Sequence, residues 1–401
     1  MRARLGDVEA GLDLARRALS LALAENMTEP AAYAYEKLGM ILENASDYRG
    51  AVNAWETAFD FCQAHGVSGT AQLCLGCLAF VFRKTGEWDR AVGVCRDVLA
   101  AGEGPRSARC AAVGQLGFIH TLRGEPRRGR PLLINSLAQA YQAEFIIMKI
   151  DSVWGLARAD QLEEAYDGAE ARCLQLLDLA RESEDGHYPV PALRWAATWF
   201  ASRGAAAETG ACAECLARLA SSTGSAEALA ALAHVLGEIA FLDGDPDRAS
   251  QQFLQALEHL RELELPLDRA ETQMRAGVAL AGVGEREAGI ERLTDCYRAA
   301  RKLGARPLAA QAAQELATLG ERVERRLGRR AARALESNGL TRRELEIVRL
   351  VAVGRTNREI ARELFLSPRT VEMHVSHALT KLRCRSRVEV AARAAEAGLL
   401  I

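Results

Sequence analysis

The side chains best suited to contacting an anionic polymer lie near the end of the chain, between residues 355 and 387. Seven of the cations there are candidates for phosphate contact: Arg355, Arg358, Arg369, Lys381, Arg383, Arg385 and Arg387. If residues 368–381 form a helix, a rotation of 100° per residue places one set of polar and apolar side chains on a single face. This set comprises Arg369, Met373, Ser376, His377 and Thr380, with Glu372 and Lys381 at its margins. Hydrogen-bonding groups beside an apolar contact are what reading base edges requires, and cations suit phosphates.

Capping signals indicate the helices that would position this face. Capping boxes are predicted at Thr341 with Glu344, Thr356 with Glu359, and Ser386 with Glu389. Ser367 followed by Pro368 is a further helix start, because serine caps the first turn and proline fits its first position. Gly354 is suited to ending the first of these helices. The opposite stripe of the third helix is apolar and is expected to be buried: Val371, Val375, Ala378, Leu379 and Leu382.

Only Phe365, Leu366 and Ser367 separate the second and third predicted helices. So short a connection suits the sharp turn of a DNA-binding helix-turn-helix, whose second helix enters the major groove. The backbone amides beside Thr356, Asn357 and Ser367 are expected to add contacts to phosphate, since amides at helix starts attract anions.

This segment, residues 340–401, resembles the LuxR-type helix-turn-helix of bacterial transcription regulators. The resemblance rests on LTRRELEIVRLVAVG, NREIARELF, LSPRTVEMHVSHALTKL and SRVE. It implies base contacts at Glu372, Met373 and Ser376, and dimerisation through a last helix at 386–399. An acidic Glu372 favours the amino group of cytosine as its partner. With the phosphate contacts, the expected DNA-binding residues are Thr356, Asn357, Arg358, Ser367, Arg369, Thr370, Glu372, Met373, Ser376, His377, Lys381 and Arg385.

The preceding chain has a different composition. Residues 321–401 hold 18 Arg and Lys against 10 Glu, a net charge of +8, so residues 1–320 carry −10 and the whole chain −2. An acidic body with a basic tail suggests a scaffold joined to a phosphate-binding module. Prolines are scarce in this body and lie near expected helix starts. The body is rich in Ala, Leu, Glu and Arg, which favour helices.

Short turn signals recur in this body at fairly regular intervals, near positions 6, 46, 86, 124, 160, 204, 244 and 284. Each unit is predicted to be a helical hairpin, with a small residue such as Ala51, Ala91, Ala165 or Ala249 where its helices pack closely. One such hairpin cannot bury its apolar face alone, so stacking is expected. The pattern resembles the tetratricopeptide family in a longer variant. The first turn signal, at Gly6, predicts that the chain opens in the middle of a unit.

The predicted fold is therefore all-α: a tetratricopeptide-like solenoid at 1–320, a charged helical linker at 321–336 and a four-helix LuxR-type domain at 337–401. The two Cys-x-x-Cys pairs, Cys74/Cys77 and Cys212/Cys215, are too far apart for a zinc ribbon and are interpreted as helix packing. Trp195 and Trp199 are likewise assigned to packing rather than to a ligand groove. No metal, cofactor or catalytic residue is predicted, and G-x-x-x-x-G-K-[ST] is absent from the sequence.

The function predicted is that of a transcription regulator, an activator, that binds promoter DNA as a homodimer while its repeats sense a protein or small-molecule effector. RNA polymerase is a further expected partner. Without a signal peptide or an apolar run long enough to span a bilayer, the expected location is the cytoplasm. Two alternatives remain open at this point. The chain is either the output fragment of a signalling ATPase regulator or a protein-interaction scaffold. The first is considered because the large ATP-dependent LuxR regulators combine helical repeats with a LuxR-type domain.

Overall fold

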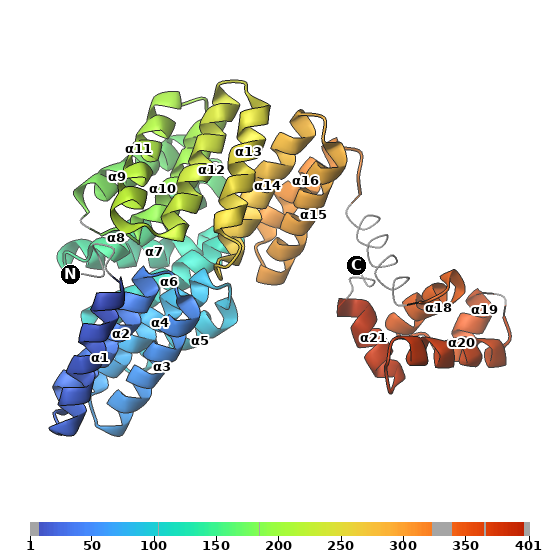
Figure 1. The fold of residues 1–401 in the computed structure, drawn as a ribbon, viewed down its shortest axis with the longest axis horizontal. Coiled ribbons are helices and arrows are strands. Elements are labelled where there is room, and N and C mark those ends of the chain that lie inside the picture. The colour runs from blue at the N-terminus through green and yellow to red at the C-terminus, as the bar shows by residue number, and fades with distance from the viewer. Residues whose placement is uncertain (1–7, 103, 184, 323–338, 365, 397–401) are drawn as a thin grey trace. The chain divides into compact units, whose positions relative to one another are not determined.

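The computed structural model describes residues 8–102, 104–183, 185–322, 339–364 and 366–396 (Figure 1). These residues form α-helices and no strand, which confirms the all-α prediction. They divide into two compact units, 1–312 and 313–401. The predicted linker 321–336 lies outside the described residues from 323 onward, so the domain boundaries stay predictions. In the described part of the chain, no helix combines the length and apolarity that crossing a bilayer would need.

The repeat unit is a series of antiparallel helices joined by short loops. Its helices are α1 (Val8–Ala24), α2 (Thr28–Asn44), α3 (Tyr48–Ala64), α4 (Ser68–Lys84), α5 (Trp88–Ala100), α6 (Arg106–Leu122), α7 (Pro126–Gln142), α8 (Ile146–Leu162), α9 (Tyr166–Glu182), α10 (Pro189–Ser202), α11 (Ala206–Thr223), α12 (Ala226–Leu242), α13 (Pro246–His259), α14 (Pro266–Gly282), α15 (Arg286–Leu303) and α16 (Arg306–Thr318). The predicted helical hairpins are confirmed, and prolines begin α7, α10, α13 and α14.

The interval between helix starts is half of the interval between the predicted turn signals. Helices begin at Val8, Thr28, Tyr48, Ser68 and Trp88, which are evenly spaced along the chain. The loops share a backbone feature at the same interval: a left-handed residue with positive φ, as at Asn26, Ser46, Gly66 and Gly86. This conformation ends one helix and turns the chain for the next, and glycine adopts it without steric cost. Glycine occupies this position in most of the repeat loops, and Asn26, Ser46, Glu144 and Glu164 occupy it in four others.

The small residue of each hairpin occupies the fourth position of its second helix. Ala51, Ala91 and Ala249 are completely buried there, as predicted. In the fourth hairpin the prediction was wrong by four positions: the turn follows Leu162, Ala165 is exposed, and Ala169 is the buried residue. The signal near Asp160 misled because this aspartate lies within α8, where it pairs with Arg130 at 2.7 Å and Arg172 at 2.6 Å.

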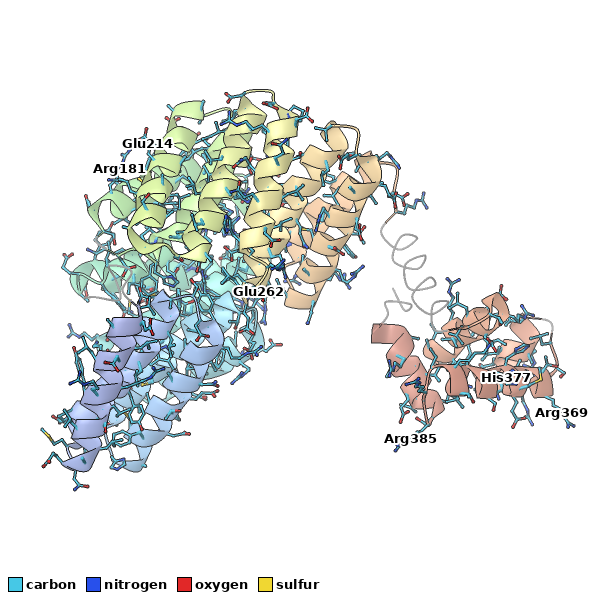
Figure 2. All side chains as sticks on the ribbon, in the orientation of Figure 1. Arg181, Glu214, Glu262, Arg369, His377 and Arg385 are labelled. Atoms are coloured by element: carbon cyan, nitrogen blue, oxygen red, sulfur yellow. The ribbon has the colours of Figure 1, made fainter. Side chains whose placement is uncertain are left out.

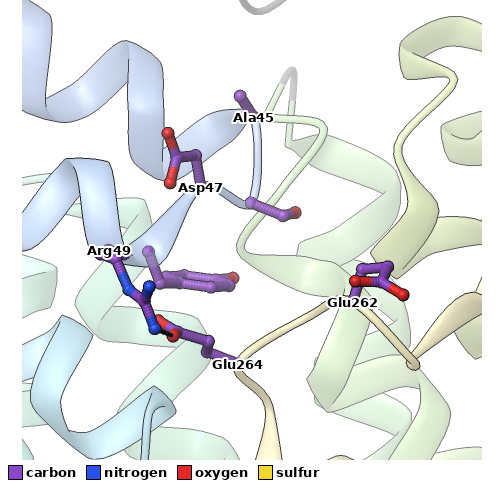
Figure 3. Close-up of a pocket in the computed structure, with 7 residues that line it drawn as sticks. Ala45, Asp47, Arg49, Glu262 and Glu264 are labelled. Carbon is purple, nitrogen blue, oxygen red and sulfur yellow. Dashed lines mark hydrogen bonds and ion pairs between the residues drawn. The ribbon is translucent and has the colours of Figure 1, made fainter.

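Segments near the start of the repeat unit contact segments near its end. Arg49 Nη2 lies 2.6 Å from Glu264 Oε1, and these two residues line a cleft of about 490 Å³ beside Asp47 and Glu262 (Figure 3). Further along, Arg306 donates to the carbonyl of Arg123 and contacts the carboxylate of Glu125, each at 2.7 Å. Segments far apart in sequence are thereby joined within one unit.

The core of this unit contains the cysteines and tryptophans. Cys74, Cys212 and Cys215 are buried, and burial raises the pKa of Cys74 and of Cys212 to about 12. Trp195 and Trp199 are also buried. These positions are those expected for packing, and thiols with so high a pKa remain protonated at neutral pH.

Candidate nucleic-acid interface

The C-terminal unit consists of four described helices around a small apolar core. They are α18 (Arg342–Ala352), α19 (Asn357–Glu363), α20 (Pro368–Lys381) and α21 (Arg387–Glu396). Leu345, Ile347, Val348 and Ile360 lie in this core together with the predicted stripe of α20. Val371, Val375, Ala378 and Leu382 of that stripe are buried, and Leu379 is half-buried against them. The apolar side of α20 therefore faces inward, as predicted.

Local hydrogen bonds begin each of these helices where the sequence predicted. Thr341 with Glu344, and Thr356 with Glu359, form complete capping boxes, and Ser367 Oγ accepts the amide of Thr370 at 3.0 Å. The third predicted box is modified: Ser386 Oγ accepts the Glu389 amide, but the Glu389 carboxylate accepts from the amide of Arg385 instead. Such caps fix where α20 starts, and so which of its side chains point outward.

The outward side of α20 presents the predicted base-contacting residues. Glu372, Met373, Ser376 and His377 are exposed, and Met373 retains 48% of its surface in contact with solvent. Nothing in the described residues covers this methionine, so its thioether is available for an apolar contact. A carboxylate, a thioether, a hydroxyl and an imidazole thus share one accessible helix face.

Three predicted phosphate-contacting arginines frame this face. Arg358 on α19, Arg369 in the first turn of α20 and Arg385 beyond the end of α20 are all exposed. Figure 2 shows Arg369 and Arg385 toward opposite ends of α20, with His377 between them. Flexible cations on either side of a helix can neutralise phosphates while the helix contacts bases. Thr356 and Ser367 are exposed, whereas Asn357 and Thr370 are half-buried.

Lys381 has a carboxylate partner inside the domain. Its ammonium lies 2.7 Å from Glu344 Oε2 and 3.0 Å from Oε1, and Glu344 is almost fully buried. Although burial raises the pKa of Glu344, the bonds from Lys381 and Thr341 outweigh it and lower that pKa. Lys381 therefore links the start of α18 to the end of α20. Its predicted phosphate contact stays a prediction.

Arg387 makes a second connection that the sequence did not reveal. Its guanidinium donates to Asn357 Oδ1 at 2.8 Å and to the backbone carbonyl of Arg355. These bonds join the first turn of α21 to the start of α19 and occupy the side chain of Asn357. No local pattern signals such a contact, since the partners belong to different helices that are distant in sequence. Arg387 therefore orients the helix-turn-helix rather than standing free beside it.

Residues 338–394 match the family described as bacterial regulatory proteins, luxR family. Over 76 residues the chain is 43% identical to an HTH-type transcriptional regulator of Mycobacterium bovis, covering 19% of this chain and 9% of that protein. It is 43% identical to the transcriptional regulatory protein LiaR of Bacillus subtilis over 70 residues, covering 18% and 33%. It is 48% identical to the oxygen regulatory protein NreC of Staphylococcus aureus over 61 residues, covering 15% and 28%.

Each of these similarities covers less than a fifth of this chain and about a third or less of the relative's length. Among solved structures, NprR in complex with its peptide NprX superposes on 68% of this chain and 82% of that one, with 13% identity and a TM-score of 0.48. A tetratricopeptide repeat protein from Parabacteroides merdae covers 69% and 98%, with 15% identity and a TM-score of 0.37.

Proposed function

Because residues 338–394 form a LuxR-type helix-turn-helix domain, we propose that this chain is a sequence-specific DNA-binding transcription regulator. The observation that carries the proposal is the division of α20: Val371, Val375 and Ala378 are buried, while Glu372, Met373 and Ser376 are exposed. A helix held in this way can enter the major groove with its outer side turned to the bases.

The proposed contacts follow from the chemistry of each exposed group. Glu372 accepts a hydrogen bond from the amino group of cytosine, and Met373 contacts a thymine methyl group. The hydroxyl of Ser376 and the imidazole of His377 add hydrogen bonds to base edges. Arg358, Arg369 and Arg385 contact phosphates and fix the register of the domain on the duplex. This function requires no catalytic step.

We further propose that the chain acts as a homodimer through α21. Val388 on this helix is 77% exposed, although Val390 and Ala394 of the same helix are buried. An exposed valine on a short helix suits a contact with a second copy, and paired domains would read two half-sites. In this proposal the repeat unit senses a protein or small-molecule effector in the bacterial cytoplasm, and RNA polymerase is a partner at the promoter.

The proposal is tested by selecting bound sequences from a random DNA pool with the full chain. Met373→Ala and Glu372→Ala should each change base preference at one position by about 1–3 kcal/mol, because each removes one base-edge contact. Val353→Ala is a matched control, since Val353 is exposed and apolar but lies at the end of α18. Recovery of the same motif from both variants, or of no motif from the wild type, would contradict the proposal.

A further inference from the structure

Charged side chains meet across the inside of the repeat unit, between helices distant in sequence. Arg158 on α8 and Arg194 on α10 both contact Glu271 on α14, each at 2.5 Å. Arg194 also lies 3.2 Å from Asp268, one turn earlier on α14. We call these four residues the inner bridge. Their side chains are 4–13% exposed, so the bridge is largely removed from solvent.

A second contact of the same kind joins α4 to α12. The ammonium of Lys84 contacts Glu227, whose carboxylate also accepts a 2.5 Å hydrogen bond from Tyr48. In both contacts the cation comes from the first part of the unit, α4 to α10, and the carboxylate from α12 or α14. The inner face of α4, α8 and α10 therefore attracts carboxylates, and here it contacts those of the same chain.

Several hydrogen-bond donors around the inner bridge are buried without an acceptor among the described residues: Arg158 Nε, Arg194 Nε and Trp154 Nε1. Arg194 and Trp154 are only 4% and 3% exposed. Buried polar atoms in proteins nearly always have a partner, so three neighbouring donors without one require an explanation. All three are donors, and the group that would satisfy them is an acceptor.

Aromatic rings complete the same surface. The guanidinium of Arg158 lies 5.3 Å from the ring centre of Trp154 and 5.1 Å from that of Trp195. Stacking on rings fixes the plane of a guanidinium, which then presents its N–H groups in the direction of a bound carboxylate. The site thus combines two oriented arginines with an apolar wall.

The energetics of the inner bridge favour exchange of its carboxylates. Charged groups lose hydration on burial, so a buried ion pair contributes little net stability compared with apolar packing. Contacts made through long side chains can therefore be replaced at small cost by contacts of equal chemistry from a ligand. Burial alone would raise the pKa of Glu271, but Arg158 and Arg194 lower it to about 2, so it is ionised at neutral pH.

We infer that the inner face of α4, α8 and α10 is a binding site for a carboxylate-bearing effector, and that Glu227, Asp268 and Glu271 occupy it as intramolecular competitors. A ligand with two or more carboxylates displaces these three side chains from Lys84, Arg158 and Arg194. The inference identifies the ligand chemistry of the sensing role proposed above, and it rests on that role only for its connection to transcription.

The test measures binding to the full chain without DNA, through the fluorescence of the tryptophans around Arg158. Tetraglutamate and citrate are the probes, which distinguishes a peptide source of carboxylates from a small molecule, and tetraglutamine is the uncharged control. Glu271→Gln removes the competitor but keeps both arginines, so it should bind at least one probe about tenfold more tightly than wild type. Glu258→Gln removes an exposed carboxylate on α13 and should leave the affinity unchanged.

A second variant tests whether the arginines hold the probe. R158M/R194M/D268N/E271Q removes the whole inner bridge without leaving an unpaired charge, so it should fold, as circular dichroism would verify, and lose binding. If Glu271→Gln does not fold, Asp268→Asn replaces it, with an expected gain of about threefold because its contact with Arg194 is longer. Equal affinities of the wild type and the competitor variants, absence of saturable binding, or binding by the quadruple variant would overturn the inference.

Failure here is separable from failure of the proposed function. A chain that binds DNA selectively but neither probe contradicts the carboxylate site alone. A chain that binds tetraglutamate but selects no DNA contradicts the regulator and leaves the site intact.

Discussion

In the repeat unit, Arg83, Lys84 and Arg194 are buried and each contacts a carboxylate, whereas in the C-terminal unit Arg358 and Arg369 are exposed. The same residue type thus serves two purposes. A buried cation must be paired, because an uncompensated charge away from water is costly, and so it determines how distant helices meet. An exposed cation is free to exchange water and counterions for phosphate. Burial therefore marks Arg83 and Arg194 as structural, whereas the phosphate contacts proposed for Arg358 and Arg369 require exposure.

Arg83→Met is expected to give the largest effect. Arg83 Nη2 lies 2.8 Å from Asp151 Oδ2, and its loss leaves a buried carboxylate without its cation. Unfolding by urea, followed by tryptophan fluorescence, should show a loss of about 3–5 kcal/mol. Arg369→Met should change stability by less than about 0.5 kcal/mol. Because the buried Gln115 amide bonds both residues, R83M/Q115M/D151L should recover most of the loss, and a single-variant loss below about 1 kcal/mol would contradict the structural role of Arg83.

Glu43 makes the stability of the repeat unit depend on pH. Burial raises its pKa from 4.5 to about 7, while the Tyr188 hydroxyl donates to its carboxylate at 2.5 Å. The folded chain therefore retains a proton that the unfolded chain releases above pH 4.5. The stability contributed by this protonated carboxyl is complete below about pH 4.5, declines as pH rises toward 7, and is then lost.

Glu43→Gln should remove this dependence, since the amide does not titrate. Between about pH 4.5 and pH 8 the wild type should lose about 3 kcal/mol more than the variant, the equivalent of the raised pKa. Urea unfolding at a series of pH values measures the difference. Parallel stability curves for wild type and variant would show that the carboxyl has an ordinary pKa in the fold.

Within the C-terminal unit, Lys381 is paired with a carboxylate and Arg369 is exposed, so their replacement should have different effects. Lys381→Ala breaks the contact with Glu344 and should destabilise residues 339–396 by about 1 kcal/mol, measured by hydrogen exchange. Arg369→Ala should leave exchange unchanged but reduce the slope of log affinity against log salt by about 1, because one phosphate contact is lost. If Lys381→Ala changed only the salt slope, its contact with Glu344 would have no structural importance.

The smallest expected effect concerns the loops of the repeats. Glu164 has a φ of +58° at a position where other loops carry glycine. Glu164→Gly should raise the free energy of unfolding by up to about 1 kcal/mol, since glycine adopts this conformation without strain. Glu214→Gly, in the middle of α11 where the side chain is exposed (Figure 2), should instead cost about 1 kcal/mol. Thermal unfolding of both variants measures these opposite signs.

Much of the C-terminal unit could be predicted because its signals are local. Thr341, Thr356 and Ser367 cap helices through bonds to residues three positions away, and the periodicity of an α-helix separates Val371 and Val375 from Met373. The contacts of Lys381 with Glu344 and of Arg387 with Asn357 could not be predicted, since they join different helices that are distant in sequence. Both change how the predicted site is interpreted.

The helices, their caps and the two faces of α20 follow from the order of residues alone, because hydrogen bonds and periodicity within one turn decide these features. The helical repeats were less completely predictable, since left-handed residues other than glycine, such as Asn26 and Glu164, disguise some of the loops. The packing of distant helices is what brings Lys84 to Glu227 and places Arg158 and Arg194 on Glu271. Many arginines and carboxylates of this chain could pair with one another, because they are chemically equivalent. Which of them meet depends on how many packed helices are arranged in space.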